Sequence, residues 1–312
     1  MKDGYNRNIN YMRLSITEKC NYKCRYCISD NCNKLQNELS FDELYDICVA
    51  AVECGINKIR ITGGEPLLRK GVVDFCSRLS RISGLNELAI TTNGSLLKEY
   101  ASDLIRAGVN RINVSLDTLY PDKFKCITRV DDLNNVLCGL DEAARCGFKN
   151  IKINVVLLKG INTDEISDFV ELTKDNNFSV RFIELMPIGN PCFDYNKHYI
   201  STDAVITAAP KLQRVSFDGV AQVYKVDGYK GTVGLIRPIT KKFCDVCNRI
   251  RVTADGKLKP CLYSNVEYDL RNLSYDILLS TFKCAIINKP SAHNFGACCS
   301  NFNQRNMNQI GG

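Results

Sequence analysis

Short runs of β-branched and other apolar residues recur along the first part of the chain, and a longer stretch with helical spacing follows each one. Short apolar runs of this kind favour strands, whereas apolar residues at every third or fourth position favour amphipathic helices. The runs predict strands at 11–17, 58–62, 87–92, 111–116, 151–157 and 179–184. Helices are expected over 41–54, where Ser40 is a suitable N-cap, and over 133–146.

Six strand–helix units in succession predict an α/β fold, here a partial (β/α)6 barrel of the TIM type with a parallel sheet. Glycines or polar residues follow the second to the sixth strand, at Gly63-Gly64, Asn93-Gly94, Asp117, Gly160 and Gly189. The loops that follow parallel strands all open on one face of such a barrel, where active sites are built. We therefore expect the site at this face.

The strand–helix alternation ends near residue 190. Two strands at 222–226 and 232–236, separated by Asp227-Gly228, predict a hairpin, and a helix is expected near 275–284. A second group of cysteines lies between the hairpin and this helix. We expect two regions, a partial barrel over residues 1–210 and a C-terminal extension over residues 211–312.

Composition limits the class of protein. Of the 312 residues, 45% are hydrophobic and 24% are charged, which excludes wholesale disorder and a collagen-like repeat. No apolar run is long enough to span a membrane, and the first residues lack the apolar core of a signal peptide, so we expect a cytoplasmic protein. A net charge of +7 suits an anionic small molecule or a nucleic acid.

Seventeen cysteines, an odd number, in a large chain without an export signal argue against a disulfide framework and favour metal or cluster ligation. Two triads have motif-like spacing: Cys20, Cys24 and Cys27 after the first strand, and Cys244, Cys247 and Cys261 in the C-terminal region. At this cysteine frequency a triad of one fixed spacing arises by chance in roughly one chain in twenty.

Three thiolates can hold three irons of a 4Fe–4S cluster and leave the fourth iron open to another ligand, whereas a structural metal site closes all its positions. The triads therefore indicate clusters that bind something. Zinc remains an alternative. It would need a fourth ligand, which could be Cys32 for the first triad and His293, Cys298 or Cys299 for the second.

The segment Cys20-Asn21-Tyr22-Lys23-Cys24-Arg25-Tyr26-Cys27, with Gly63-Gly64-Glu65-Pro66 after the next strand, resembles the radical S-adenosylmethionine (SAM) superfamily. The resemblance narrows to the GTP 3′,8-cyclase (MoaA) family of molybdenum-cofactor biosynthesis and runs from Asp3 to Gly312. It rests on the segments 13–17, 91–94, 112–117, 181–184 and 247–251, and on the terminal Gly311-Gly312. One departure is Asn6, because the family usually has glycine before the early arginine.

The resemblance implies two 4Fe–4S clusters, held by the two triads, and S-adenosylmethionine as cofactor. The 5′-deoxyadenosyl radical would abstract the 3′ hydrogen of GTP. Closure of the C3′–C8 bond would then give 3′,8-cyclo-7,8-dihydroguanosine 5′-triphosphate. On this basis, residues 1–210 form the radical SAM barrel, and residues 211–312 carry the auxiliary cluster and part of the GTP site.

The resemblance also implies roles for individual residues. Those expected to bind the cofactor are Tyr26, Gly64, Ser115 and Met186. Those expected to bind GTP are Arg13, Arg60, Thr91, Lys152, Arg249 and Arg251, and a catalytic part falls to Arg249, Arg251, Gly311 and Gly312. Guanidinium groups suit a triphosphate, and unpaired cations among apolar strand residues would be costly.

The expected partners are GTP, a one-electron donor and cyclic pyranopterin monophosphate synthase, which would receive the product; the resemblance also allows a homodimer. Neither nucleic acid nor membrane is expected. The alternatives are another radical SAM enzyme with an auxiliary cluster that acts on a peptide, and a zinc-stabilised nucleic-acid-binding module. The latter is suggested by the charge and by Lys241-Lys242, but the chain has no tryptophan and no basic stripe interleaved with aromatic residues.

Overall fold

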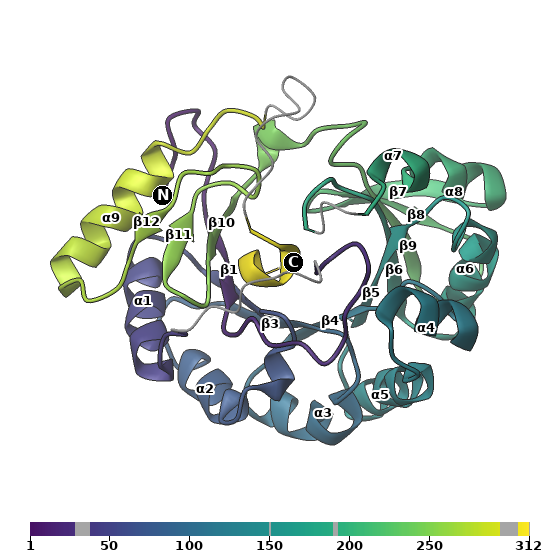
Figure 1. Ribbon diagram of the computed structural model, residues 1–312, viewed down its shortest axis with the longest axis horizontal. Helices are drawn as coiled ribbons and strands as arrows, with labels where there is room; N and C mark the ends of the chain where they lie inside the picture. Colours follow the sequence, from purple (N-terminus) through teal and green to yellow (C-terminus); the bar gives the residue numbers. More distant parts are fainter. Residues whose placement is uncertain (29–37, 150, 190–192, 294–304, 312) are drawn as a thin grey trace.

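A twelve-stranded sheet, with β12 and β7 at its two edges, forms the centre of the molecule (Figure 1). The computed structural model describes residues 1–28, 38–149, 151–189, 193–293 and 305–311. The strand order is β12-β11-β10-β1-β2-β3-β4-β5-β6-β9-β8-β7. The strands are β1 (Tyr11–Ser15), β2 (Lys58–Thr62), β3 (Glu87–Thr92), β4 (Arg111–Ser115), β5 (Ile151–Leu157), β6 (Phe178–Glu184), β7 (Gln213–Asp218), β8 (Ala221–Lys225), β9 (Thr232–Ile236), β10 (Arg249–Val252), β11 (Lys257–Lys259) and β12 (Tyr268–Asp269).

Helices cover the convex side of this curved sheet, and α9 packs against α1 (Figure 1). The helices are α1 (Phe41–Glu53), α2 (Val72–Leu79), α3 (Leu97–Arg106), α4 (Pro121–Thr128), α5 (Leu133–Arg145), α6 (Ile166–Asp175), α7 (Tyr195–His198), α8 (Asp203–Ala208), α9 (Tyr275–Ile287) and α10 (Met307–Ile310). Short 3-10 turns occur at η1 (Pro66–Leu68), η2 (Thr163–Glu165) and η3 (Cys244–Val246). None of the described helices is long and apolar enough to cross a membrane.

The six predicted strand–helix units are present, and β1 to β6 are parallel neighbours. The expected partial barrel is therefore confirmed. The first helix begins where the sequence predicted, because Ser40 accepts a hydrogen bond from the Glu43 amide at 3.2 Å while the Glu43 carboxylate accepts one from the Ser40 amide at 2.7 Å. This capping box satisfies two amides of the first turn that the helix itself leaves without acceptors.

The C-terminal part of the chain lengthens the same sheet on both sides, which the sequence did not indicate. The predicted hairpin is present as β8 and β9, and β9 pairs in parallel with β6. On the other side, β10 pairs in parallel with β1. The division at residue 210 stays a prediction, and strands from both sides of it form one continuous surface.

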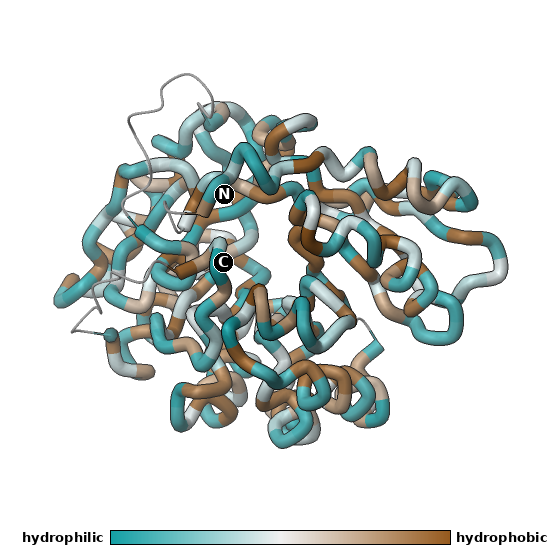
Figure 2. Tube along the Cα trace, turned by 45° about the vertical axis from the view of Figure 1, so that its right-hand side comes forward, coloured by the Kyte–Doolittle hydropathy of each residue, from teal (hydrophilic) through white to brown (hydrophobic). Residues whose placement is uncertain are grey.

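Polar and apolar residues alternate along the strands, so the two faces of the sheet differ. On β1, Met12 and Leu14 are fully buried in the hydrophobic core, while Arg13 between them lines a cavity. The same mixture of hydrophilic and hydrophobic positions runs through the chain in Figure 2. The C-terminal end of the chain lies inside the curve of the sheet (Figure 1). The concave face is therefore both polar and accessible to the tail.

Candidate active site

One cavity with a volume of about 310 Å³ brings the two cysteine triads together. It is lined by Cys20, Cys24 and Cys27 from the loop after β1 and by Cys244, Cys247 and Cys261 from the segments that flank β10 and β11. All six are free thiols that are neither fully buried nor fully exposed. Residues more than 200 positions apart in the sequence thus line the same cavity.

The donor set suits iron–sulfur clusters, because thiolates are the ligands that hold such clusters. Among the described residues, no three His, Cys, Asp or Glu side chains lie close enough together to hold one metal ion. His293, a candidate fourth ligand, lines the cavity, but its ring stacks on Tyr263 with centroids 4.4 Å apart and its Nε2 lies 3.2 Å from the Pro238 carbonyl oxygen. The other candidates, Cys32, Cys298 and Cys299, lie outside the described residues.

The charges beside Cys247 in the second triad favour its thiolate. Burial alone would raise the pKa of Cys247, but nearby Lys289 and Arg249 bring it below its usual value. The Lys289 ammonium is itself fixed, since it donates to the carbonyl oxygens of Arg249 at 2.8 Å and Pro260 at 2.6 Å. Lys289 was not among the predicted site residues, and no motif in the sequence marks it.

The first cysteine loop is held by its backbone and by one buried side chain. The amides of Lys23 and Arg25 each donate at 3.0 Å to carbonyl oxygens at the end of α4. The Tyr26 hydroxyl donates to Asp117 Oδ2 at 2.7 Å, and Asp117 Oδ1 accepts from the Val156 amide at 2.8 Å. Burial raises the pKa of Asp117 to about 6. Asp117 thus joins the loop to the ends of β4 and β5.

The Gly63-Gly64-Glu65-Pro66 segment packs against this loop. A Cβ atom on Gly64 would lie 2.4 Å from the Lys19 carbonyl oxygen, so the close approach that requires glycine is to the chain itself. Glu65 is fully buried and accepts hydrogen bonds from Thr92 Oγ1 at 2.8 Å and the Asn93 amide at 2.7 Å. The segment therefore links the loop after β2 to the end of β3.

The four residues expected to bind the cofactor, Tyr26, Gly64, Ser115 and Met186, all line the cavity beside the first triad. Asp117 and Asn154 line it as well, although the sequence-based set did not include them. The sequence placed Asp117 directly after a parallel strand, at the face where the site was expected, but assigned it no ligand.

Arginines form a row across three neighbouring strands. Arg251 on β10 is in register with Arg13 on β1, and Arg13 is in register with Arg60 on β2, so the three share one face of the sheet. The pKa of Arg13 is lowered to about 10, mainly by burial and also by Arg60 and Arg249, against the effect of Tyr11. Such mutual repulsion among buried cations indicates that an anion belongs between them.

Several of these cations have no protein counterion in the described part of the chain. Within it, Arg60, Arg249 and Arg251 form no salt bridge, and Arg60 Nε and Arg249 Nη2 are buried without a hydrogen-bond acceptor. Arg13, Arg249, Arg251 and Thr91 line the cavity directly, whereas Arg60 and Lys152 are not among its lining residues.

Lys152 was expected to bind GTP, but in the structure its ammonium group is paired with a carboxylate. It is buried on β5, and its Nζ donates to Asp218 Oδ2 at 2.5 Å. Arg181 on β6 forms a second ion pair with the same carboxylate. Asp218 comes from the end of β7, at the edge of the sheet, and its side chain is 48% exposed.

The tail reaches the same cavity. Arg251 Nη1 donates to the carbonyl oxygens of Ile310, at 3.1 Å, and of Gly311. Gly311 has a φ of +69°, and a Cβ atom there would lie 2.2 Å from Thr62 Oγ1, so only glycine fits. Gly312, which was predicted to act with it, lies outside the described residues.

Comparison with known proteins agrees with this geometry. Residues 14–173 match the Radical SAM superfamily, and residues 178–295 match the family described as Molybdenum Cofactor Synthesis C. The chain is 47% identical to the GTP 3′,8-cyclase of Peptoclostridium acidaminophilum, over 99% of this chain and 98% of the relative. It is 46% identical to the GTP 3′,8-cyclase of Alkaliphilus oremlandii over the full length of both.

Solved structures support the fold alone, because their sequences are distant. Streptococcus suis SuiB aligns with a TM-score of 0.61 at 14% identity, covering 88% of this chain and 66% of that one. Native anSMEcpe with bound AdoMet aligns with a TM-score of 0.58 at 16% identity, covering 89% of this chain and 82% of that one. By its full-length relatives and its two matched families, the chain belongs to the GTP 3′,8-cyclase family of the radical SAM superfamily.

Proposed function

We propose that this chain converts GTP to 3′,8-cyclo-7,8-dihydroguanosine 5′-triphosphate in molybdenum-cofactor biosynthesis, with S-adenosylmethionine and two 4Fe–4S clusters. The observation that carries the proposal is the single cavity lined by both cysteine triads and by three arginines. Cys20, Cys24 and Cys27 would hold the first cluster and Cys244, Cys247 and Cys261 the second. When bound, the first cluster supplies the electron that cleaves S-adenosylmethionine to methionine and the 5′-deoxyadenosyl radical.

The cofactor is oriented by groups from four loops on one face of the sheet. Tyr26 and Gly64 line the cavity next to the first triad, and Ser115 and Met186 line it at the ends of β4 and β6. Asp117 accepts a hydrogen bond from the Tyr26 hydroxyl at 2.7 Å, and this bond holds the part of the first cysteine loop that would contact the adenine. A fixed orientation matters because a primary carbon radical must meet one hydrogen before it reacts elsewhere.

GTP is bound by the arginine row. The triphosphate accepts hydrogen bonds from Arg13, Arg249 and Arg251, which line the cavity, and Arg249 Nη2 is a buried donor without an acceptor in the described structure. Arg60, next to Arg13 in the row, does not line the cavity and would act on the triphosphate by its charge. The Thr91 hydroxyl, buried without a hydrogen-bond partner in the described structure, contacts the nucleotide. Arg251, which lines the cavity, donates to the Gly311 carbonyl oxygen, so that one arginine of the nucleotide site also anchors the tail. In the proposed reaction, C3′ of the ribose would face the cofactor at the first triad and the purine would face the second triad.

The proposal extends to the surroundings of the enzyme. A one-electron donor delivers two electrons in each turnover, one to cleave S-adenosylmethionine and one, with a proton, to reduce the radical that ring closure leaves on the purine. Cyclic pyranopterin monophosphate synthase receives the product, and the chain works in the cytoplasm, where thiols stay reduced. A homodimer is part of the proposal.

The test is anaerobic incubation of the reconstituted protein with S-adenosylmethionine, a reductant and either GTP or no nucleotide. We expect 5′-deoxyadenosine and the cyclised nucleotide to form in equal amounts, and only when GTP is present. ATP in place of GTP serves as the matched control. Formation of 5′-deoxyadenosine that depends on a peptide and not on GTP would favour the peptide-modifying alternative and refute the proposal.

A further inference from the structure

The tail over residues 305–311 is bound at both of its ends by the same short stretch of chain. At one end, Arg251 on β10 donates to the Ile310 carbonyl oxygen at 3.1 Å. At the other end, Arg305 pairs with Asp255, in the turn between β10 and β11, at 2.9 Å. The two anchors on the strand side are only four residues apart, so they fix both the position and the direction of the tail.

Between its ends the tail touches the first cysteine loop. The Met307 amide donates to the Cys27 carbonyl oxygen at 3.3 Å, and Asn308 Nδ2 donates to the Glu18 carbonyl oxygen at 3.1 Å. The tail therefore runs from the strands beside the second triad to the loop that carries the first. A shift of the tail would change its contacts with both.

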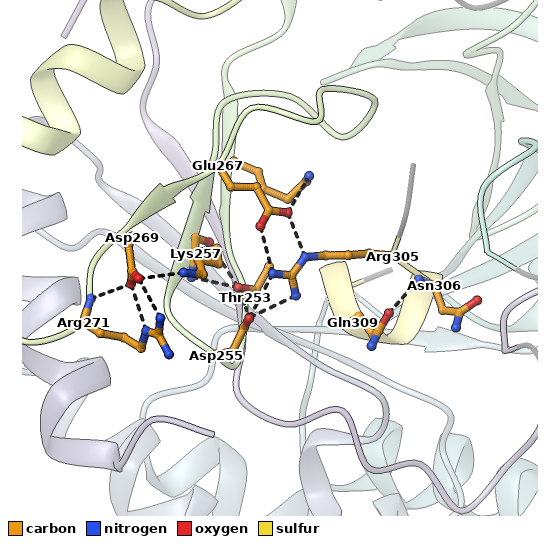
Figure 3. Close-up of polar contacts among 10 residues, drawn as sticks. Thr253, Asp255, Lys257, Glu267, Asp269, Arg271, Arg305, Asn306 and Gln309 are labelled. Carbon is orange, nitrogen blue, oxygen red and sulfur yellow. Dashed lines mark hydrogen bonds and ion pairs between the residues drawn. The ribbon is translucent and has the colours of Figure 1, made fainter. Parts of the chain in front are cut away.

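The Arg305 guanidinium makes the strongest contacts at the start of the tail (Figure 3). It donates to both oxygens of Asp255, at 3.1 and 2.9 Å, and to both oxygens of Glu267, each at 2.8 Å. Its side chain is 15% exposed, and those of Asp255 and Glu267 are 10% and 22% exposed. Partly buried bidentate pairs of this kind are stronger and more directional than surface ion pairs.

Other groups hold the two carboxylates in place. Asp255 Oδ1 accepts from Thr253 Oγ1 at 2.5 Å, and Glu267 Oε1 accepts from the fully buried Lys259 ammonium at 3.0 Å. Two cations thus face two carboxylates. Arg305 lowers the pKa of Asp255 and of Glu267, although their burial alone would raise both.

The tail does not hold itself in position. Asn306 and Gln309 form a capping box for α10, with the Asn306 amide donating to Gln309 Oε1 at 2.9 Å. A helix of four residues is far too short to be stable alone, so its place depends on contacts outside it. Arg305 alone contributes four hydrogen bonds to side chains outside the tail.

We infer that Arg305, with Asp255 and Glu267, is a positioning residue that sets the register in which the tail over residues 305–311 lies against the cavity. It lies six residues from Gly311 and acts only through the tail and the two carboxylates. The catalytic consequence rests on the proposed function. The positional consequence does not, and it can be measured without any substrate.

Carboxypeptidase digestion of the cluster-loaded protein, followed by mass spectrometry, reports the position of the tail. We expect Arg305→Ala to release the last residues about tenfold faster or more than the unaltered chain, since local opening follows the lost contact free energy. Arg305→Lys keeps the positive charge but cannot form the bidentate pairs. Its digestion rate should therefore lie between those of Arg305→Ala and the unaltered chain. The control is Arg271→Ala, which removes another bidentate pair, with Asp269 at 2.7 and 3.0 Å, in the same group of strands (Figure 3).

Equal digestion of Arg305→Ala and the unaltered chain, or equal acceleration in Arg271→Ala, would overturn the inference. Should Arg305→Ala not fold, Arg305→Lys carries the same comparison. In turnover, Arg305→Ala should give less cyclised nucleotide per 5′-deoxyadenosine, with the KM for S-adenosylmethionine and the iron content unchanged. A normal ratio in a variant whose tail is digested quickly would also refute it. If no nucleotide is cyclised by any variant, the digestion result still stands and only the proposed function fails.

Discussion

Lys152 on β5 and Asp218 at the end of the edge strand β7 form an ion pair, with Nζ and Oδ2 2.5 Å apart. The same carboxylate serves Arg181, so one half-exposed aspartate neutralises two buried cations. A triphosphate that uses Lys152 has to displace Asp218. We therefore expect Asp218→Asn to bind GTP about three- to tenfold more tightly, since releasing such a pair costs on the order of 1 kcal/mol.

Isothermal titration with the reconstituted protein measures this change. Asp227→Asn, in the exposed turn between β8 and β9, makes the same change in net charge without touching Lys152, and its affinity should stay close to that of the unaltered chain. An unchanged or weakened affinity in Asp218→Asn would mean that Asp218 supports the nucleotide site rather than competing for it.

The affinity for GTP should fall as the pH rises through about 8. Burial and Arg181 lower the pKa of Lys152 to about 8, against the effect of Asp218 and together with Arg111. Tyr11 is also buried, which raises its pKa, but Arg60, Arg13 and Arg249 bring the pKa down to about 8. Above this pH the ammonium loses its positive charge and the phenol gains a negative one. Both changes weaken attraction for a triphosphate.

Binding measured between about pH 7 and pH 9 should show a loss of threefold or more, on the order expected for one lost cation. Lys152→Arg keeps its charge throughout this range and should have a flatter profile. A profile that does not change in Lys152→Arg would assign the pH dependence to Tyr11.

Tyr26→Phe should weaken binding of S-adenosylmethionine. The variant removes the 2.7 Å hydrogen bond to Asp117 and leaves a buried carboxyl with one donor fewer, at a cost of about 1–3 kcal/mol in stability. Because the tyrosine holds the first cysteine loop, we expect the KM for the cofactor to rise several-fold. Tyr22→Phe, which loses a 2.7 Å bond to Asp132 from the same loop, is the matched comparison and should have the smaller effect.

Deleting Gly311 and Gly312 should abolish cyclised product while iron content and cofactor binding remain. Gly311→Ala should act in the same direction, because the new Cβ would overlap Thr62 Oγ1 and the residue has a φ of +69°. Gly147→Ala separates the two causes, since Gly147 has a φ of +93° but open space around its Cβ position. Product analysis by liquid chromatography decides the matter, and normal turnover by the truncated chain would contradict the role of the tail.

Cys261→Ala should halve the iron bound by the chain, from about eight to about four atoms, since each triad is expected to hold one four-iron cluster. Cys284→Ala is the control, because Cys284 is exposed on α9, away from both triads. Iron and labile sulfide are measured after anaerobic reconstitution. Stoichiometric zinc without sulfide in the unaltered chain would instead favour the zinc-stabilised module.

The local sequence pattern determined much of the fold. The strands at 58–62, 87–92 and 151–157 and the hairpin partner at 232–236 have the predicted bounds, because alternation of polar and apolar side chains is a property of each segment alone. The first strand ends at Ser15 rather than at residue 17. Asn6, where the family usually has glycine, has a φ of +64°, a conformation that glycine adopts easily and asparagine tolerates.

The triads and the arginines were found from spacing, residue chemistry and the family resemblance, but their meeting in one cavity depends on distant contacts. Parallel pairing of β10 with β1 joins residues about 240 positions apart and sets Arg251 beside Arg13. Likewise, Asp218 at the end of the edge strand β7 pairs with Lys152 on β5, although three strands lie between β5 and β7 in the sheet order. Register between such strands is set by packing of the whole sheet rather than by any one segment. The sequence therefore determined which charged and thiol groups are present. The tertiary structure decided which of these groups share a counterion, line the same cavity or contact the C-terminal tail.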